Sequence, residues 1–273
     1  MDNLETKKHL TVGHSIGISG IMILAMLIFS PLIFLSKYIG EESSMFIYYI
    51  VAIGVASWLA YVIKRKATTE KPFINLAIRN KIILPFIILG TVALLYGVVS
   101  PISELIPMPE IIKKAFMNLA KGTGIFAFLM MVVAAPVLEE LIFRGIILDG
   151  LLEKYSPLKS ILISSILFGI VHLNPWQFVA AVILGGFSGW IYYKTKSLSL
   201  SIIIHATANF CGYITRLFID ESSMDKSSIE FYGGLLNYIL IILASIIITA
   251  LCVLFIRKEF RKAEIREVEN ASR

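Results

Sequence analysis

The chain has 273 residues, of which 57% are apolar and 16% are charged, and it carries a formal net charge of +6 at pH 7. Soluble domains contain about 45–50% apolar and about 25% charged residues, so this composition excludes an ordinary soluble protein and predicts an integral membrane protein. The basic residues stand in short segments between apolar runs, which favours a role in membrane orientation and argues against a nucleic-acid partner.

Eight apolar runs divide the chain. Windows of about 20 apolar residues predict membrane-spanning helices, and the alternation typical of barrel strands does not occur in this sequence. In chain order, the predicted spans are 16–35, 45–63, 82–99, 125–147, 158–173, 178–193, 200–218 and 235–256. The sequence therefore predicts an all-α polytopic membrane protein with about eight transmembrane helices.

The distribution of lysine and arginine predicts the orientation of these spans. With the N-terminus inside, the cytoplasmic segments carry 18 of the 25 basic residues. Because short cytoplasmic loops are enriched in Lys and Arg, this bias predicts that both termini are cytoplasmic. The short loops and compact length favour a location in a bacterial cell membrane.

A single transmembrane domain is expected over residues 1–273. Within it, 125–215 form the predicted catalytic core, 1–124 the N-terminal spans and an interfacial segment, and 216–273 the last span and a basic tail. The interfacial segment has a helical pattern with one apolar face, which indicates either a short helix at the membrane surface or an ordinary connector. That face comprises Ile111, Ile112, Ala115, Phe116 and Leu119.

The fourth predicted span contains three charged residues within six positions. They are Glu139, Glu140 and Arg144, and Phe143 lies among them. A charged side chain in mid-bilayer costs about 2.5–3.5 kcal/mol even on the lenient insertion scale. These groups are therefore expected to face protein or water, and the hexapeptide 139–144 is the predicted centre of function.

The two adjacent glutamates cannot face the same point, because successive residues of an α-helix diverge by about 100°. Glu140 precedes Arg144 by four residues, the favourable order for an ion pair on one helix face. We therefore expect Glu139 to face a reactive site and Glu140 to be held by Arg144. A modest rotation of the helix would exchange the roles of the two glutamates.

Two later spans carry further polar residues at helical spacing. Phe168 and His172 are four residues apart in the fifth span, and residues at this spacing share a helix face. His205 and Asn209 have the same spacing in the seventh span. Counted from the basic edges at about 1.5 Å per residue, Glu139, His172 and Asn209 all lie about 20 Å deep, and His205 lies about one turn away. The common depth predicts one buried site made by three spans.

These residue types suit the hydrolysis of a peptide bond. A carboxylate and an imidazole, here Glu139 and His172, can hold and deprotonate a water molecule. His205 and Asn209 can then donate hydrogen bonds to the developing oxyanion. Cys211 lies six residues from His205 on another helix face, so no side-chain nucleophile pairs with a histidine and water is the expected nucleophile.

A zinc site is the alternative use of the same side chains. Glu139, His172 and His205 offer the carboxylate and nitrogen ligands of a catalytic zinc ion with an open position. The His-Glu-x-x-His motif does not occur in the sequence. The residues therefore leave two mechanisms open, one with a divalent metal such as zinc and one without a cofactor.

The three blocks resemble the CPBP family of intramembrane proteases, which includes the CAAX prenyl endopeptidases and bacterial proteins linked to bacteriocin processing and immunity. The family pattern is Glu-Glu-x-x-x-Arg, then Phe-x-x-x-His, then His-x-x-x-Asn or Asp. All three blocks occur here in that order on separate predicted spans, within about residues 125–215.

The resemblance implies an eight-span helical fold and an endopeptidase that cuts a membrane-associated peptide or protein tail. It implies that Glu139 and His172 activate water while the His205 block stabilises the oxyanion. The residues with supporting roles would be Glu140, Phe143, Arg144 and Phe168. Family members are commonly called metalloproteases, and a metal-free glutamate mechanism has also been argued for them.

Two other functions remain open from the sequence. A proton-coupled secondary transporter could use Glu139, Glu140 and the two histidines as a proton relay, although neither a repeat nor paired broken spans support it. A non-catalytic bacteriocin-immunity protein could keep the same fold without the chemistry.

Overall fold

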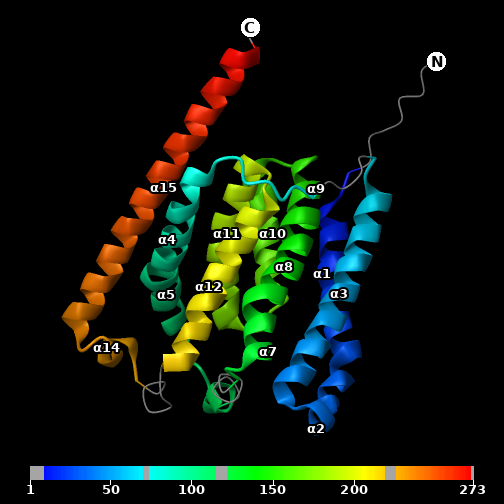
Figure 1. Cartoon of the computed structure of the whole chain (residues 1–273), viewed down its shortest axis with the longest axis vertical. Coiled ribbons are helices and arrows are strands. Elements are labelled where there is room, and N and C mark those ends of the chain that lie inside the picture. The colour runs from blue at the N-terminus through cyan, green and yellow to red at the C-terminus, as the bar shows by residue number, and fades with distance from the viewer. Residues whose placement is uncertain (1–8, 70–73, 115–121, 219–225, 272–273) are drawn as a thin grey trace. The chain divides into compact units, whose positions relative to one another are not determined.

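The computed structural model describes residues 9–69, 74–114, 122–218 and 226–271. Within these ranges every regular element is a helix, as Figure 1 shows, and no strand is present. The predicted all-α fold is therefore confirmed. The helix predicted at 110–121 lies partly outside the described residues: 110–114 are helical, whereas Ala115, Phe116 and Leu119 are not described.

Six helical runs in the described part of the chain are long and apolar enough to cross a membrane. They are Val12–Ile39, Glu41–Ala67, Lys81–Glu104, Ile125–Leu152, Leu198–Phe218 and Leu235–Asn270. The helix α10 (Pro157–Ile170) is apolar but has only 14 residues, and α11 (Pro175–Thr195) is not among the runs that meet both criteria. A helix occurs at each of the eight predicted positions, and six of these helices are long and apolar enough to cross a membrane, so the chain is a polytopic integral membrane protein.

The chain divides into two compact units. The first comprises Met1–Ala77 and Gly122–Ala206, and the second comprises Ile78–Lys121 and Thr207–Arg273. The first unit contains α1 (Val12–Phe29), α3 (Glu41–Ala67), the run 125–152, α10 and α11. The helix α12 (Leu198–Phe218) begins in the first unit and ends in the second.

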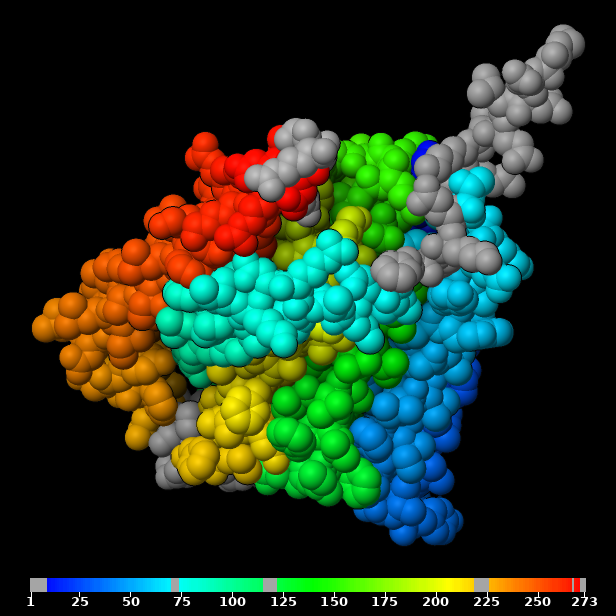
Figure 2. Space-filling view, turned by 45° about the horizontal axis from the view of Figure 1, so that its top comes forward, coloured from blue at the N-terminus to red at the C-terminus, as the bar shows by residue number. Residues whose placement is uncertain are grey.

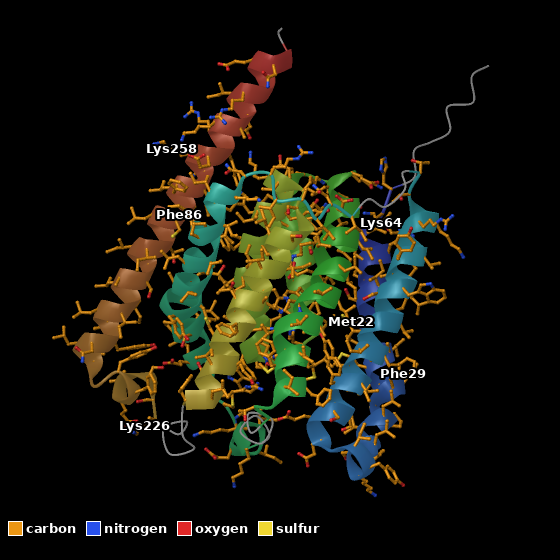
Figure 3. The ribbon with its side chains drawn as sticks, viewed as in Figure 1. Met22, Phe29, Lys64, Phe86, Lys226 and Lys258 are labelled. Atoms are coloured by element: carbon orange, nitrogen blue, oxygen red, sulfur yellow. The ribbon has the colours of Figure 1, made fainter. Side chains whose placement is uncertain are left out.

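The core of the first unit is formed by apolar side chains from α1, α3, the run 125–152, α10 and α11. Figure 1 shows α1 and α3 side by side, and Figure 2 shows α3 lying against the run 125–152. The fully buried members include Ile18, Ile53, Ile142, Phe143 and Ile147, and Met22, labelled in Figure 3, packs with them. Burial of this apolar surface fixes which faces of the site helices point inward.

The end of α10 differs from the prediction. The apolar run predicts a span through residue 173, but α10 ends at Ile170, and Leu173 has a left-handed φ of 56°. Asn174 then caps α11 by accepting a hydrogen bond from the backbone N–H of Gln177, and Pro175 occupies the first helical position. Because Asn174-Pro175 opens a new helix, His172 lies in the turn between two helices and not inside a span.

Several segments predicted as cytoplasmic meet at one end of the first unit. Nζ of Lys64, near the end of α3 in Figure 3, lies 2.7 Å from Oδ2 of Asp149, and Nζ of Lys196 lies 2.9 Å from Oδ1. The backbone N–H of Leu198 donates to the carbonyl of Asn75 at 2.8 Å. Lys64, which the sequence places among the loop charges, is only 1% exposed because it neutralises Asp149 inside the unit.

The second unit is built on the packing of α4 (Leu84–Leu94) against α15 (Leu235–Ala271). The rings of Phe86 and Phe255 stack with centroids 3.8 Å apart. Figure 3 labels Phe86 on α4 and Lys258 on α15, one turn beyond Phe255 along that helix. The basic residues of the predicted tail therefore continue the last helix beyond its apolar run.

Candidate active site

The run 125–152 carries the acidic pair on an interrupted helix. The α-helical segment α8 (Ala135–Glu140) lies between two π-helical segments, η4 (Leu129–Ala134) and η5 (Leu141–Leu148). Pro136 has no N–H to donate to the preceding turn, so the wider turn of η4 accommodates a missing hydrogen bond. π-Helical turns are frequent at functional sites. Both glutamates close α8, at the point where the helix geometry changes.

Glu140 is held by donors from two helices. Its Oε1 accepts a hydrogen bond from Nη1 of Arg144 at 2.9 Å, and both side chains are 1% exposed. Its Oε2 accepts a hydrogen bond from Oγ of Ser188 on α11 at 3.2 Å. The ion pair expected from the four-residue spacing is present, and both carboxylate oxygens of Glu140 have protein partners.

Glu139 is also buried, but it is bound at one oxygen only. Its Oε1 accepts a hydrogen bond from the hydroxyl of Tyr49 on α3. Its Oε2 has no hydrogen-bond partner among the described residues, and the nearest ionic partner is Nε2 of His205 at 3.9 Å. One carboxylate oxygen of Glu139 thus remains able to accept a proton.

His205 lies between the two glutamates. Its Nε2 faces Glu139, and its Nδ1 lies 3.2 Å from Oε1 of Glu140 without hydrogen-bond geometry. The structure therefore brings side chains from the fourth and seventh predicted spans into one polar cluster. Asn209 follows His205 by one turn of α12, on the same face of that helix, in the part assigned to the second unit.

Phe168 is the centre of an aromatic contact shell around this cluster. Its ring meets the rings of His172 and His205 edge-on, with centroids 5.0 and 5.5 Å away. Cζ of Arg144 lies 4.8 Å from the Phe168 centroid, and the Phe143 ring lies 4.9 Å from it. The Phe168 ring thus contacts both histidines, and its π-system attracts the guanidinium of Arg144.

His172 is oriented by a backbone carbonyl. Its Nδ1 lies 2.8 Å from the carbonyl oxygen of Phe168. A carbonyl can only accept, so Nδ1 is the donor, and in the tautomer with its proton on Nδ1 the ring carries its lone pair on Nε2. This arrangement leaves Nε2 as an acceptor for a water molecule or a ligand. The backbone carbonyl of His172 accepts from Nδ2 of Asn174 at 3.0 Å, which further restrains the turn.

The predicted zinc ligands do not form a three-donor site in this structure. Among the described residues, no three side chains of His, Cys, Asp or Glu lie close enough together to hold a metal ion. Oε2 of Glu139 lies 3.9 Å from Nε2 of His205, whereas the ring of His172 contacts the ring of Phe168. The donor set of the described residues therefore does not fit a zinc ion.

Two residues of the site belong to none of the three sequence blocks. Tyr49 and Ser188 lie 90 and 48 residues from the glutamates that they contact. Ser188 stands between Gly185 and Gly189 in a mostly apolar helix, and the small residues are the only local sign of a close helix approach. Tyr49 follows another tyrosine in a span, which is unremarkable by itself.

Comparisons with known proteins cover the segment that carries the site. Residues 121–211 match the family described as type II CAAX prenyl endopeptidase Rce1-like. The chain is 33% identical over 106 residues to "Putative membrane peptidase YdiL" of Bacillus subtilis (strain 168), across 38% of this chain and 43% of that protein. It is 33% identical over 81 residues to "UPF0177 protein YxdF" of Lactococcus lactis subsp. lactis (strain IL1403), across 29% of this chain and 44% of that protein.

The chain thus spans less than half the length of these two curated relatives. No solved structure matches it significantly. The family match includes all three sequence blocks, from Glu139 to Asn209. The predicted resemblance is confirmed for this segment: residues 121–211, which hold the acidic pair and both histidines, are related to the type II CAAX prenyl endopeptidases of the Rce1-like family.

Proposed function

We propose that this protein is an intramembrane endopeptidase in which Glu139 is the general base. The observation that carries the proposal is the unequal binding of the two glutamates. Both oxygens of Glu140 accept hydrogen bonds, whereas Oε2 of Glu139 has no such partner among the described residues. A base needs an oxygen that is free to accept a proton, and this favours Glu139 over the exchanged assignment.

In the proposed mechanism, Oε2 of Glu139 accepts a proton from a water molecule as the water oxygen attacks the carbonyl carbon of the substrate. Nε2 of His172 accepts a hydrogen bond from the same water and orients it. The new C–O bond pushes the carbonyl electron pair onto oxygen, and His205 and Asn209 donate hydrogen bonds to that oxyanion. Glu139 then passes its proton to the leaving nitrogen as the C–N bond breaks.

The substrate class follows from the membrane setting and the family match. We propose a membrane-associated peptide or protein tail, because the site lies among helices long and apolar enough to span a bilayer. The matched family is described as type II CAAX prenyl endopeptidase, which supports a cleavage site close to a membrane anchor. Both relatives are bacterial, which supports a location in a bacterial cell membrane.

Glu139→Gln tests the base directly. The amide keeps the shape of the side chain and the acceptor for Tyr49 but cannot accept the proton of water, so we expect cleavage to fall to background. Membrane and secreted peptides from cells with the wild-type protein and with Glu139→Gln are compared by mass spectrometry. Peptides that depend on the wild-type protein should disappear in the variant.

The matched control is Glu153→Gln, which changes a carboxylate directly after the run 125–152, 3.4 Å from Nδ1 of His9. This variant is expected to give the wild-type peptide pattern. Identical peptide patterns in wild-type and Glu139→Gln cells, with equal amounts of inserted protein, would contradict the proposed function.

A further inference from the structure

We propose that Tyr49 is the positioning residue of the catalytic carboxylate, holding Glu139 so that Oε2 faces the attacking water. The proposal rests on the proposed function of Glu139 and adds a residue from outside the three sequence blocks. Tyr49 lies on α3, before the segment that matches the family. Its hydroxyl donates to Oε1 of Glu139.

The hydrogen bond distinguishes the two oxygens of one carboxylate. Rotation about the last bond of a glutamate side chain is soft and nearly two-fold, so an unbound carboxylate exchanges its oxygens readily. A donor on Oε1 stops this exchange. Oε2 is then the oxygen that faces Nε2 of His205 at 3.9 Å, and it has no hydrogen-bond partner in the part of the chain that the structure describes.

Glu140, the neighbouring glutamate, is a carboxylate in the same site whose two oxygens both accept hydrogen bonds. Glu140 receives hydrogen bonds from Arg144 on its own helix and from Ser188 on α11. Glu139 receives its hydrogen bond from Tyr49 of α3 alone among the described residues. Removal of one hydroxyl would therefore leave the proposed base without an anchoring hydrogen bond.

The aromatic ring of Tyr49 has a separate role, which makes the hydroxyl testable by itself. The ring packs against the apolar core of the first unit. Tyr49→Phe removes the hydroxyl and keeps this packing. A charge-assisted hydrogen bond is stronger than a neutral one, so its loss is expected to matter for a carboxylate more than for a carbonyl.

Tyr48 is a matched control on the same helix. Its hydroxyl donates to the backbone carbonyl of Met26 on α1 at 3.0 Å, away from both glutamates. Tyr48→Phe thus makes the same chemical change one position earlier and removes one hydrogen bond within the same unit. Any general effect of losing a tyrosine hydroxyl from α3 should appear in both variants.

The experiment compares wild type, Tyr49→Phe, Tyr48→Phe and Glu139→Gln, each purified as the full chain in detergent. The probe for activity is an internally quenched farnesylated CAAX peptide. We expect kcat of Tyr49→Phe to fall about 10- to 100-fold with KM within about twofold of wild type. Tyr48→Phe should keep both constants, and melting temperatures should show that both variants are folded.

A second measurement needs no substrate. The infrared difference between wild type and Glu139→Gln isolates the carboxyl band of Glu139. That band should shift in Tyr49→Phe and stay in place in Tyr48→Phe. Unchanged kcat and an unshifted band in Tyr49→Phe, with Glu139→Gln inactive, would overturn the positioning role and leave the base assignment intact.

Equal losses of activity and melting temperature in both tyrosine variants would also overturn the proposal, because they would reflect packing alone. Full activity of Glu139→Gln would instead remove the base itself, and with it the group that Tyr49 is inferred to position.

Discussion

Arg144 and Glu140 are two charges taken almost completely out of solvent, and each depends on the other. Removing one partner of a buried pair leaves an uncompensated charge, which costs more than the pair contributes to stability. Arg144 also lies against the Phe168 ring, and a Cβ atom built on Gly185 would come within 2.9 Å of its Nη2. The glycine of α11 therefore provides the space in which the guanidinium reaches Glu140.

Arg144→Met tests this dependence at the scale of one residue. Methionine fills a similar volume without a charge, so Glu140 would keep only the hydroxyl of Ser188 and its contact with His205. We expect the free energy of unfolding to fall by about 3–5 kcal/mol. Chemical denaturation in detergent micelles measures it.

Arg144→Met combined with Glu140→Gln is the control, because it removes both charges of the pair. This double variant should recover part of the stability that Arg144→Met loses. A single variant as stable as wild type would contradict a structural ion pair.

At some glycines a neighbouring helix lies too close for a larger residue. In the second unit, η3 (Leu95–Val99) is a π-helical segment that continues α4, and Gly97 lies on its face toward α15. A Cβ atom built on Gly97 would lie 2.6 Å from Cβ of Ser245 and 3.3 Å from the α15 backbone. Because backbone cannot move aside as a flexible side chain can, this contact requires glycine.

Gly97→Ala is therefore expected to force η3 and α15 apart. Overpacking of this kind costs about 1–3 kcal/mol, and thermal melting of the purified protein measures it. Gly212→Ala on α12 is the matched control, because its Cβ would meet nothing within 4 Å and alanine favours a helix over glycine. The control should melt at or above the wild-type temperature. If Gly97→Ala also melts at or above the wild-type temperature, the close contact between η3 and α15 does not require glycine, and the prediction is wrong.

At the scale of the whole molecule, the charge distribution predicts which end of the bundle is cytoplasmic. Lys37 lies on α2 (Ser36–Ile39), immediately before α3, and Arg65 lies in the last turn of α3. The 27 residues of α3 span about 40 Å, which is longer than the hydrocarbon core of a bilayer. The two exposed side chains therefore report on opposite sides of the membrane.

Lys37→Cys and Arg65→Cys test the orientation in a chain whose two native cysteines, Cys211 and Cys252, are replaced by alanine. A membrane-impermeant maleimide should label Lys37→Cys in intact cells. It should label Arg65→Cys only after the membrane is permeabilised. The reverse pattern would show that the termini lie outside, and the cysteine-free chain controls for background labelling.

The amino-acid sequence determined the type and the approximate positions of the long apolar helices because those depend on local composition. Long apolar runs must form internally hydrogen-bonded helices in lipid, so the predicted positions agree with α3 and α12 to within a few residues. The Glu140–Arg144 pair was predictable for the same reason, since both residues lie on one helix at a spacing of four. The residues of the family pattern also stand in order along the chain.

Only the tertiary structure decided which glutamate keeps an unbound oxygen. That difference comes from Tyr49 and Ser188, which reach the acidic pair from helices far along the chain, and no local pattern encodes such contacts. The tertiary structure also places His172 outside a helix. Leu173 has a left-handed backbone conformation and Asn174-Pro175 begins α11, so α10 ends earlier than predicted. Sequence periodicity shows which residues share a face of one helix. Contacts between helices depend on how the apolar faces pack, and this packing is a property of the folded chain.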